Sequence, residues 1–151
     1  MTGDIGLMLR AVIPEIGILV LVFIVLLMDM ILGRGKRRFS LGWVTIGGLV
    51  VIAVLSILFS RPQGEAELIW GGMLRFDEAG FLFRILFLIG GILTTLFIMG
   101  YKDIERHAEY YILLLISMLG MNLMASSADL VMLYLAIETT SIPLYILAGF
   151  L

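Results

Sequence analysis

Residues 13–32, IPEIGILVLVFIVLLMDMIL, decide the fold of this chain. Their only charged side chains are Glu15, near the start, and Asp29, near the end. About twenty mostly apolar residues are the length of helix that crosses the ~30 Å hydrocarbon layer of a bilayer. A helix is required there because lipid offers no hydrogen-bond partner to an open backbone. Pro14 suits the first helical turn, where its missing N–H costs nothing. The stretch therefore predicts a membrane-spanning helix.

The rest of the chain has the same character. It has 151 residues, of which 62% are hydrophobic and 15% charged, whereas soluble domains average ~45–50% apolar and ~25% charged residues. We expect a single membrane domain with five spans, at residues 13–32, 39–59, 79–100, 109–125 and 129–151. The sequence thus predicts an all-α membrane protein that has the lipid bilayer as its solvent.

Basic residues in the short loops predict the orientation, since lysine and arginine are enriched on the cytoplasmic side. The 33–38 loop carries Arg34, Lys36, Arg37 and Arg38 and no acid. The longer 60–78 loop on the other side mixes two arginines with four acids. We expect the N-terminus outside, and a multi-pass protein of a bacterial cytoplasmic membrane; an organelle membrane is the alternative. The basic cluster follows the first apolar run, which indicates an uncleaved span and not a signal peptide.

Two segments outside the spans leave alternatives open. In the 61–78 loop, Gly71-Gly72 lies between short apolar stretches, which fits a small hairpin with a two-residue turn, a surface loop or an interfacial segment. At the other end, the last span runs to Leu151 without a polar flank. We therefore expect further chain of the same subunit beyond it.

Composition excludes several classes of function. The net charge of −2 offers no basic stripe for nucleic acid. The chain has no cysteine and one histidine, so we expect no disulfide, no cysteine-ligated iron–sulfur cluster and no histidine-rich metal site. It has no glycine-rich phosphate-binding motif and no catalytic triad. We expect no cofactor in this chain.

Glu138 is the charged residue that lies deepest in a predicted span. It is nine residues from Asp129, or ~13 Å along a helix. A charge at the bilayer centre costs ~2.5–3.5 kcal/mol even on insertion scales, and such residues usually mark ion or proton pathways. Helical spacing places Tyr134, Ser141 and Tyr145 on the same face. Pro143 cannot donate a hydrogen bond to the Thr139 carbonyl, which hydroxyls or water would have to fill.

The predicted proton-pathway residues are therefore Glu138, Tyr134, Ser141, Pro143 and Tyr145. The alternative is a structural carboxyl that hydrogen-bonds between helices. No lysine or arginine lies at mid-depth in the five spans, so a cationic partner must come from another part of the subunit or from another subunit.

Weaker signals have simpler interpretations. We expect Arg84 to extend outward to the membrane surface, and Asp129 to cap the last helix. Asn122 is expected to hydrogen-bond to a neighbouring helix. The pairs Gly47-Gly48 and Gly90-Gly91 permit close helix approach.

The last part of the chain resembles a known family. The opening Glu109-Tyr110-Tyr111, the segment Met124-Ala125-Ser126-Ser127 before Asp129-Leu130, and the run Glu138-x-x-Ser141-x-Pro143-Leu144-Tyr145 are similar to spans four and five of subunit N of respiratory complex I, the proton-pumping NADH:quinone oxidoreductase. Pro14-Glu15, Asp29 and Phe76-Asp77 fit the same pattern more loosely.

The resemblance implies a membrane-arm subunit that takes part in proton translocation coupled to quinone reduction. Its first three spans precede two inverted five-helix antiporter-like repeats, and the glutamate matched by Glu138 pairs with a lysine on a later span. As partners it implies other membrane-arm subunits, and it places NADH, flavin, iron–sulfur clusters and quinone elsewhere in the enzyme. Related subunits of cation/proton antiporters and membrane-bound hydrogenases share this glutamate, so a transporter component and a purely structural subunit remain alternatives.

Overall fold

Five long apolar helices dominate the computed structural model, which describes residues 5–32, 39–62, 64–101 and 107–150. Each is long and apolar enough to cross a membrane, so the prediction of a five-span all-α membrane protein is confirmed. The helices are α2 (Ile13–Leu32), α3 (Phe39–Phe59), α4 (Glu78–Ile98), α5 (Ala108–Ser126) and α6 (Leu130–Ala148). The largest difference from the expected ranges is at the end of α6, which stops at Ala148 before Gly149 and not at residue 151.

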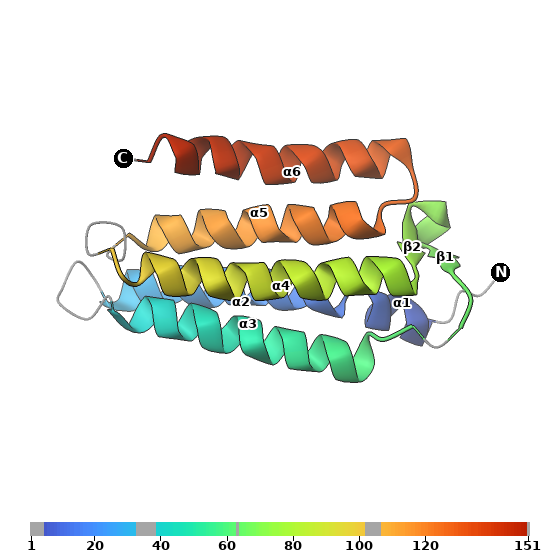
Figure 1. Cartoon of the computed structure of the whole chain (residues 1–151), viewed down its shortest axis with the longest axis horizontal. Helices are drawn as coiled ribbons and strands as arrows, with labels where there is room; N and C mark the ends of the chain where they lie inside the picture. Colours follow the sequence, from blue (N-terminus) through green and yellow to red (C-terminus); the bar gives the residue numbers. More distant parts are fainter. Residues whose placement is uncertain (1–4, 33–38, 63, 102–106, 151) are drawn as a thin grey trace.

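The helices lie side by side and alternate in direction along the chain (Figure 1). Helix α5 lies in the middle and contacts α2, α4 and α6, whereas α6 lies at the edge and packs chiefly on α5. Along the apolar stretch of each helix, 44% of the residues of α5 are buried but only 17% of those of α6. One long face of α6 is therefore uncovered by the described part of the chain.

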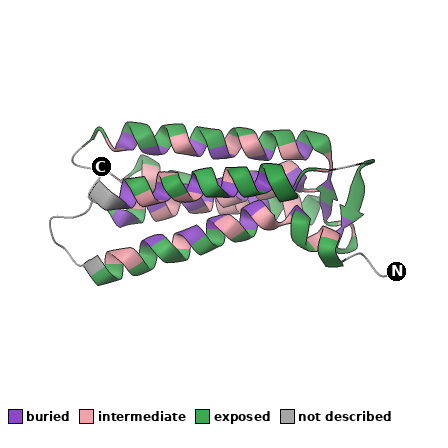
Figure 2. Ribbon diagram, turned by 90° about the horizontal axis from the view of Figure 1, so that it is seen from below, coloured by how far each residue is buried: buried purple, intermediate pink, exposed green. Residues whose placement is uncertain are grey.

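The core follows the inward faces of four helices. Leu115 and Met118 of α5 are buried together with Ile18 of α2, Leu49 of α3 and Leu88 of α4. The outward faces are apolar and exposed, as at Phe23 and Phe97 (Figure 2). Such a distribution would be unfavourable in water, but it suits helices whose outer surface meets lipid tails.

A glycine sets how closely α6 approaches α5. A Cβ on Gly120 would lie 2.6 Å from the Thr140 nitrogen and 2.9 Å from the Ala136 carbonyl oxygen. Both are backbone atoms, which cannot move aside like a flexible side chain. The two helices thus meet backbone to backbone at this crossing, and that contact fixes the rotation of α6 about its own axis.

Of the two glycine pairs predicted at helix contacts, one member of each fulfils the role. A Cβ on Gly48 would collide with Leu21, and one on Gly91 would collide with Met118. Gly47 and Gly90 have open space beside them. Close approach thus depends on one glycine of each pair.

The loop between α3 and α4 forms a small antiparallel hairpin, one of the three alternatives left open by the sequence. Strand β1 (Glu67–Ile69) pairs with β2 (Leu74–Phe76), with Ile69 opposite Leu74. The connection is not the two-residue glycine turn of the prediction. It includes a 3-10 turn, η1 (Trp70–Gly72), followed by Met73, and Trp70 and both glycines have positive φ angles of 55°, 70° and 89°.

The hairpin belongs to a compact group of elements that we call the hairpin end. A short helix that the sequence did not predict, α1 (Ile5–Ala11), packs its Ala11 against Ile69, Leu74 and Phe76. The hairpin also reaches the α5–α6 connection, where the Ala128 N–H donates to the Met73 carbonyl at 2.9 Å. The starts of α2, α4 and α6 therefore meet at one end of the bundle (Figure 1).

The direction of insertion stays a prediction, as does the assignment to an inverted repeat. The basic residues that carry the orientation argument in the 33–38 loop, with Lys102 and Arg106, lie outside the described residues.

Candidate functional site

Glu138 lies midway along its helix. It is the ninth of the 19 residues of α6, so its Cα is ~12 Å along the axis from Leu130. Apart from Glu138, the hydroxyl residues 139–141 and the two tyrosines, the residues of α6 are apolar. The position therefore corresponds to the middle of a span, where a carboxylate is costly.

The packing of α6 turns Glu138 away from α5. The residues buried in α6 are Ala136, Thr140 and Pro143, which mark the side that faces α5. At 100° per residue, Glu138 lies on nearly the opposite side of the helix. The close contact at Gly120 fixes this rotation, so the orientation of Glu138 follows from the α5–α6 crossing.

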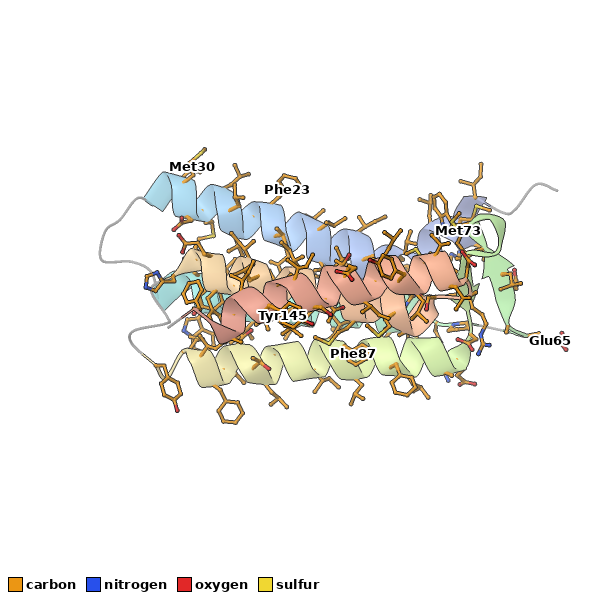
Figure 3. All side chains as sticks on the ribbon, turned by 90° about the horizontal axis from the view of Figure 1, so that it is seen from above. Phe23, Met30, Glu65, Met73, Phe87 and Tyr145 are labelled. Carbon is orange, nitrogen blue, oxygen red and sulfur yellow. The ribbon has the colours of Figure 1, made fainter. Side chains whose placement is uncertain are left out.

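The structure keeps the predicted stripe together on one face but separates Pro143 from it. Tyr134 and Tyr145 are 61% and 75% exposed, and Glu138 and Ser141 are half-buried beside them. Figure 3 looks down on this side of α6, where Tyr145 is labelled. Pro143 is buried on the α5 side, so it acts on the stripe only through the helix backbone.

No side chain in the described ranges bonds to the Glu138 carboxylate. The neighbouring hydroxyls serve their own helix: Thr139 donates to the Leu135 carbonyl at 2.7 Å, and Thr140 to the Ala136 carbonyl at 2.9 Å. Neither hydroxyl donates to the Thr139 carbonyl, which lacks its usual N–H donor because residue 143 is a proline. The stripe is thus a polar surface that the described helices leave uncovered.

A second intramembrane carboxylate, which the sequence analysis did not single out as a site, lies at the hairpin end. Glu15 of α2 forms an ion pair with Arg84 of α4, with 3.0 Å between Nη2 and Oε1, and their side chains are only 6% and 4% exposed. The expectation that Arg84 extends outward to the membrane surface is wrong. The guanidinium instead points into the bundle, because the Glu15 carboxylate and the Ala11 carbonyl oxygen lie there as its partners.

The Arg84–Glu15 pair also holds the junction between α1 and α2. Arg84 Nη1 donates to the Ala11 carbonyl oxygen at 2.7 Å. Ala11 is the last residue of α1, where carbonyls lack donors within the helix. Glu15 lies in the first turn of α2, where a negative charge is favoured. One side chain thus connects the end of α1, the start of α2 and α4.

Asn122 of α5 lies at about the same depth in the bundle as the Arg84–Glu15 pair. It shares a helix face with Met118 and Ala125, and those residues contact the α4 face that carries Gly80, Arg84 and Gly91. Its amide nitrogen donates to the Met118 carbonyl of its own helix at 2.9 Å, and its Oδ1 is buried without a partner. The predicted bond to a neighbouring helix is therefore not formed by this side chain with the described residues.

Two aspartates occupy helix N-cap positions with different results. Asp77 accepts a hydrogen bond from Gly80 N–H at 2.9 Å and another from Arg75 Nε at 2.8 Å. Burial acts to raise the pKa of Asp77, but these bonds together hold the pKa below its ordinary value. Asp129 has the N-cap backbone conformation for α6, but its side chain makes no cap bond. The sequence thus predicts the N-cap position of Asp129 correctly, but the expected hydrogen bond from its side chain to the helix is not formed.

Metal binding has no support in the part of the chain that the structure describes, where no group of three or more potential ligand residues comes together. The chemistry open to the two intramembrane sites is proton exchange at a carboxylate and ion pairing. Of the two, Glu138 is the one whose partner is not supplied by the described helices.

Comparison with known proteins gives a consistent result. No protein-family model matches the chain. Relatives described as NADH-quinone oxidoreductase subunit N include those of an Anaeromyxobacter species, 34% identical over 91% of this chain and 26% of the relative, and of Chloroflexus aggregans, 36% identical over 94% and 29%. That of a Geobacillus species is 37% identical over 90% of this chain and 28% of the relative.

The chain spans a little over a quarter of the length of these curated relatives. The match is consistent with an N-terminal portion of such a subunit, as the resemblance over Glu109–Phe150 predicts. Over about nine-tenths of its length, the chain is therefore similar to curated proteins named NADH-quinone oxidoreductase subunit N.

Proposed function

We propose that this chain forms part of a proton-translocating membrane subunit of an NADH-quinone oxidoreductase, and that Glu138 is a proton-transfer group of that subunit. The subunit would act as a translocase within the enzyme, in a bacterial cytoplasmic membrane. NADH, flavin, iron–sulfur clusters and quinone would be bound by other subunits, which are its partners together with the remainder of the same subunit.

One observation carries this proposal. A carboxylate lies midway along a membrane-spanning helix, on the face turned away from α5, without a partner in the described residues. Intramembrane carboxylates in such positions usually face a bundle interior or a water-filled cavity. A bundle interior or cavity of this kind would have to form on the open face of α6, with residues from outside these 151.

The proposed mechanism uses this unmatched charge. Desolvation favours the protonated form of a carboxylate, and a nearby cation favours the ionised form. A cation on the covering element that approaches or withdraws would make Glu138 release or take up a proton. Ser141 and the two tyrosines of the stripe offer hydroxyls that can carry a hydrogen-bonded chain toward and away from it.

The alternatives differ in what drives this proton exchange. A cation/proton antiporter component or a hydrogenase subunit would use the same carboxylate with another source of energy. The relatives described as NADH-quinone oxidoreductase subunit N support the quinone oxidoreductase. A purely structural Glu138 would be expected to bond to a neighbouring helix, and no described helix offers it a partner.

The test is substitution in the intact enzyme in inverted membrane vesicles. Glu138→Gln removes the titrating group and keeps the shape, so we expect proton pumping per NADH oxidised to fall severalfold while assembly persists. Glu138→Asp keeps an acid and should retain an intermediate rate. The matched control is Glu109→Gln, which changes an exposed acid in the first turn of α5. Wild-type pumping in Glu138→Gln would remove this residue from the pathway.

A further inference from the structure

A cavity of about 360 Å³ lies at the hairpin end, between α1, the end of α3 and β1. Its lining includes Arg10 and Arg61, Glu65 and Glu67, and the apolar residues Leu58 and Phe59. This volume is within the ~300–1,000 Å³ typical of small-molecule sites. Nothing in the proposed proton pathway uses it.

The charges around this cavity are unmatched. The side chains of Arg10, Arg61, Glu65 and Glu67 are exposed, and none makes a hydrogen bond or ion pair with another described residue. This differs from Arg75 in the same loop, which is paired with Asp77. Two arginines and two glutamates around one cavity are complementary to a ligand that carries both a negative and a positive group.

The surroundings of the cavity indicate that such a ligand has a tail. Leu58 and Phe59 are the last residues of α3 and are 67% and 56% exposed, so the cavity opens at the level where a span ends. Val51 and Val54 continue an exposed apolar strip along α3 toward the bilayer centre. Glu65, labelled in Figure 3, lies on the outer side, away from the spans. The charged side chains of the cavity thus lie at the end of the α3 span, and the exposed apolar strip of α3 continues from there toward the bilayer centre.

We propose that this cavity binds the headgroup of a zwitterionic aminophospholipid. The phosphate would lie against Arg10 and Arg61, because guanidinium groups suit phosphate oxygens. The ammonium would lie against Glu65 and Glu67, and an acyl chain would follow the α3 strip. The shared chemistry is a phosphate beside a primary ammonium, and the α3 strip favours a membrane lipid over a soluble phosphoethanolamine compound.

The experiment measures lipid retained by the purified enzyme after exchange into nanodiscs that contain equal phosphatidylethanolamine and phosphatidylglycerol. Wild-type enzyme should retain phosphatidylethanolamine preferentially. The double variant Arg10→Gln/Arg61→Gln should lower retention of both lipids by about tenfold, the effect of two weak charge contacts. Glu65→Gln/Glu67→Gln should lose the preference and favour phosphatidylglycerol. Glu109→Gln, at the opposite end of the bundle, is the control and should behave as wild type.

A competition arm separates the two sources of the headgroup. Soluble glycerophosphoethanolamine should fail to displace the retained lipid if the acyl chain contributes. Displacement at low concentration would assign the site to a soluble ligand and overturn the lipid proposal. Equal retention in wild type and the arginine double variant, with normal assembly, would show that the cavity is not a headgroup site. Neither result depends on whether Glu138 carries protons.

Discussion

Glu15 and Glu138 are both carboxylates within membrane-spanning helices, and the chain treats them in opposite ways. Glu15 is buried at the hairpin end and paired with Arg84 at 3.0 Å. Glu138 is half-buried at mid-span and turned away from α5, the helix that holds α6. A buried charge with an internal partner stabilises an arrangement of helices, whereas one left without a partner is available to something outside. This difference is the basis of our proposal that Glu15 has a structural role and Glu138 a functional one.

The largest expected effect comes from breaking the structural pair. Arg84→Gln would leave Glu15 buried without its cation and remove the donor to the Ala11 carbonyl. Loss of one partner of a buried pair typically costs ~3–5 kcal/mol. We expect a lower melting temperature of the purified enzyme and less assembled subunit. The double variant Glu15→Gln/Arg84→Gln should recover part of the loss, and additive losses instead would mean that the two residues are not coupled.

The next effect tests what turns Glu138 outward. Gly120→Ala would place a Cβ against the backbone of α6, at 2.6 Å from the Thr140 nitrogen, so α6 must shift. Overpacking of this kind costs ~1–3 kcal/mol. We expect a lower melting temperature together with lower pumping. The matched control is Gly90→Ala, which has open space beside it and should be neutral or slightly stabilising. Equal behaviour of the two variants would contradict the close crossing.

A smaller effect concerns the two N-cap aspartates at the hairpin end. Asp77→Ala removes the bond from Gly80 N–H and should cost ~1 kcal/mol, whereas Asp129→Ala removes no cap bond and should cost less. The pKa of Asp77 is lowered in the folded state, so its contribution is present above the unfolded value of ~3.9. It is lost as pH falls through the folded-state pKa. The melting temperature of Asp77→Ala should therefore converge with that of wild type at acid pH; a constant gap would contradict this.

The smallest expected effect is an absence of coupling. Glu138 has no ion pair with a described residue. The changes that Glu138→Gln and Arg84→Gln cause in the free energy of unfolding should therefore add, within ~0.3–0.5 kcal/mol. Glu15→Gln and Arg84→Gln should not be additive. A double-mutant cycle on the purified enzyme measures both couplings. Strong coupling between Glu138 and Arg84 would mean that Glu138 and the Glu15–Arg84 pair are not separate sites.

Hydrophobic length and spacing allowed much of the fold to be predicted. A run such as residues 13–32 must be a helix in lipid, and its observed bounds agree with those expected. The position of Glu138 at mid-span and the shared face of Tyr134, Glu138, Ser141 and Tyr145 follow from helical periodicity in the same way. These features depend on one helix at a time.

Features that depend on two or more helices were not predictable. Arg84 near the start of its span fits both an outward and an inward side chain, and the choice depends on Glu15 and Ala11, which are about 70 residues away along the chain. The side of α6 that faces α5 depends on Gly120, which looks no different from Gly90 in the sequence. The hairpin turn required positive φ at Trp70, which residue preferences do not indicate.

The central claim is that only the unmatched carboxylate carries protons. The direct test compares Glu138→Gln with Glu15→Gln by the ratio of protons pumped to electrons transferred, measured in the same vesicles and normalised to assembled enzyme. We expect Glu138→Gln to lower the ratio and Glu15→Gln to reduce the amount of enzyme but leave the ratio of the surviving enzyme unchanged. A lower ratio in Glu15→Gln with an unchanged ratio in Glu138→Gln would contradict the account.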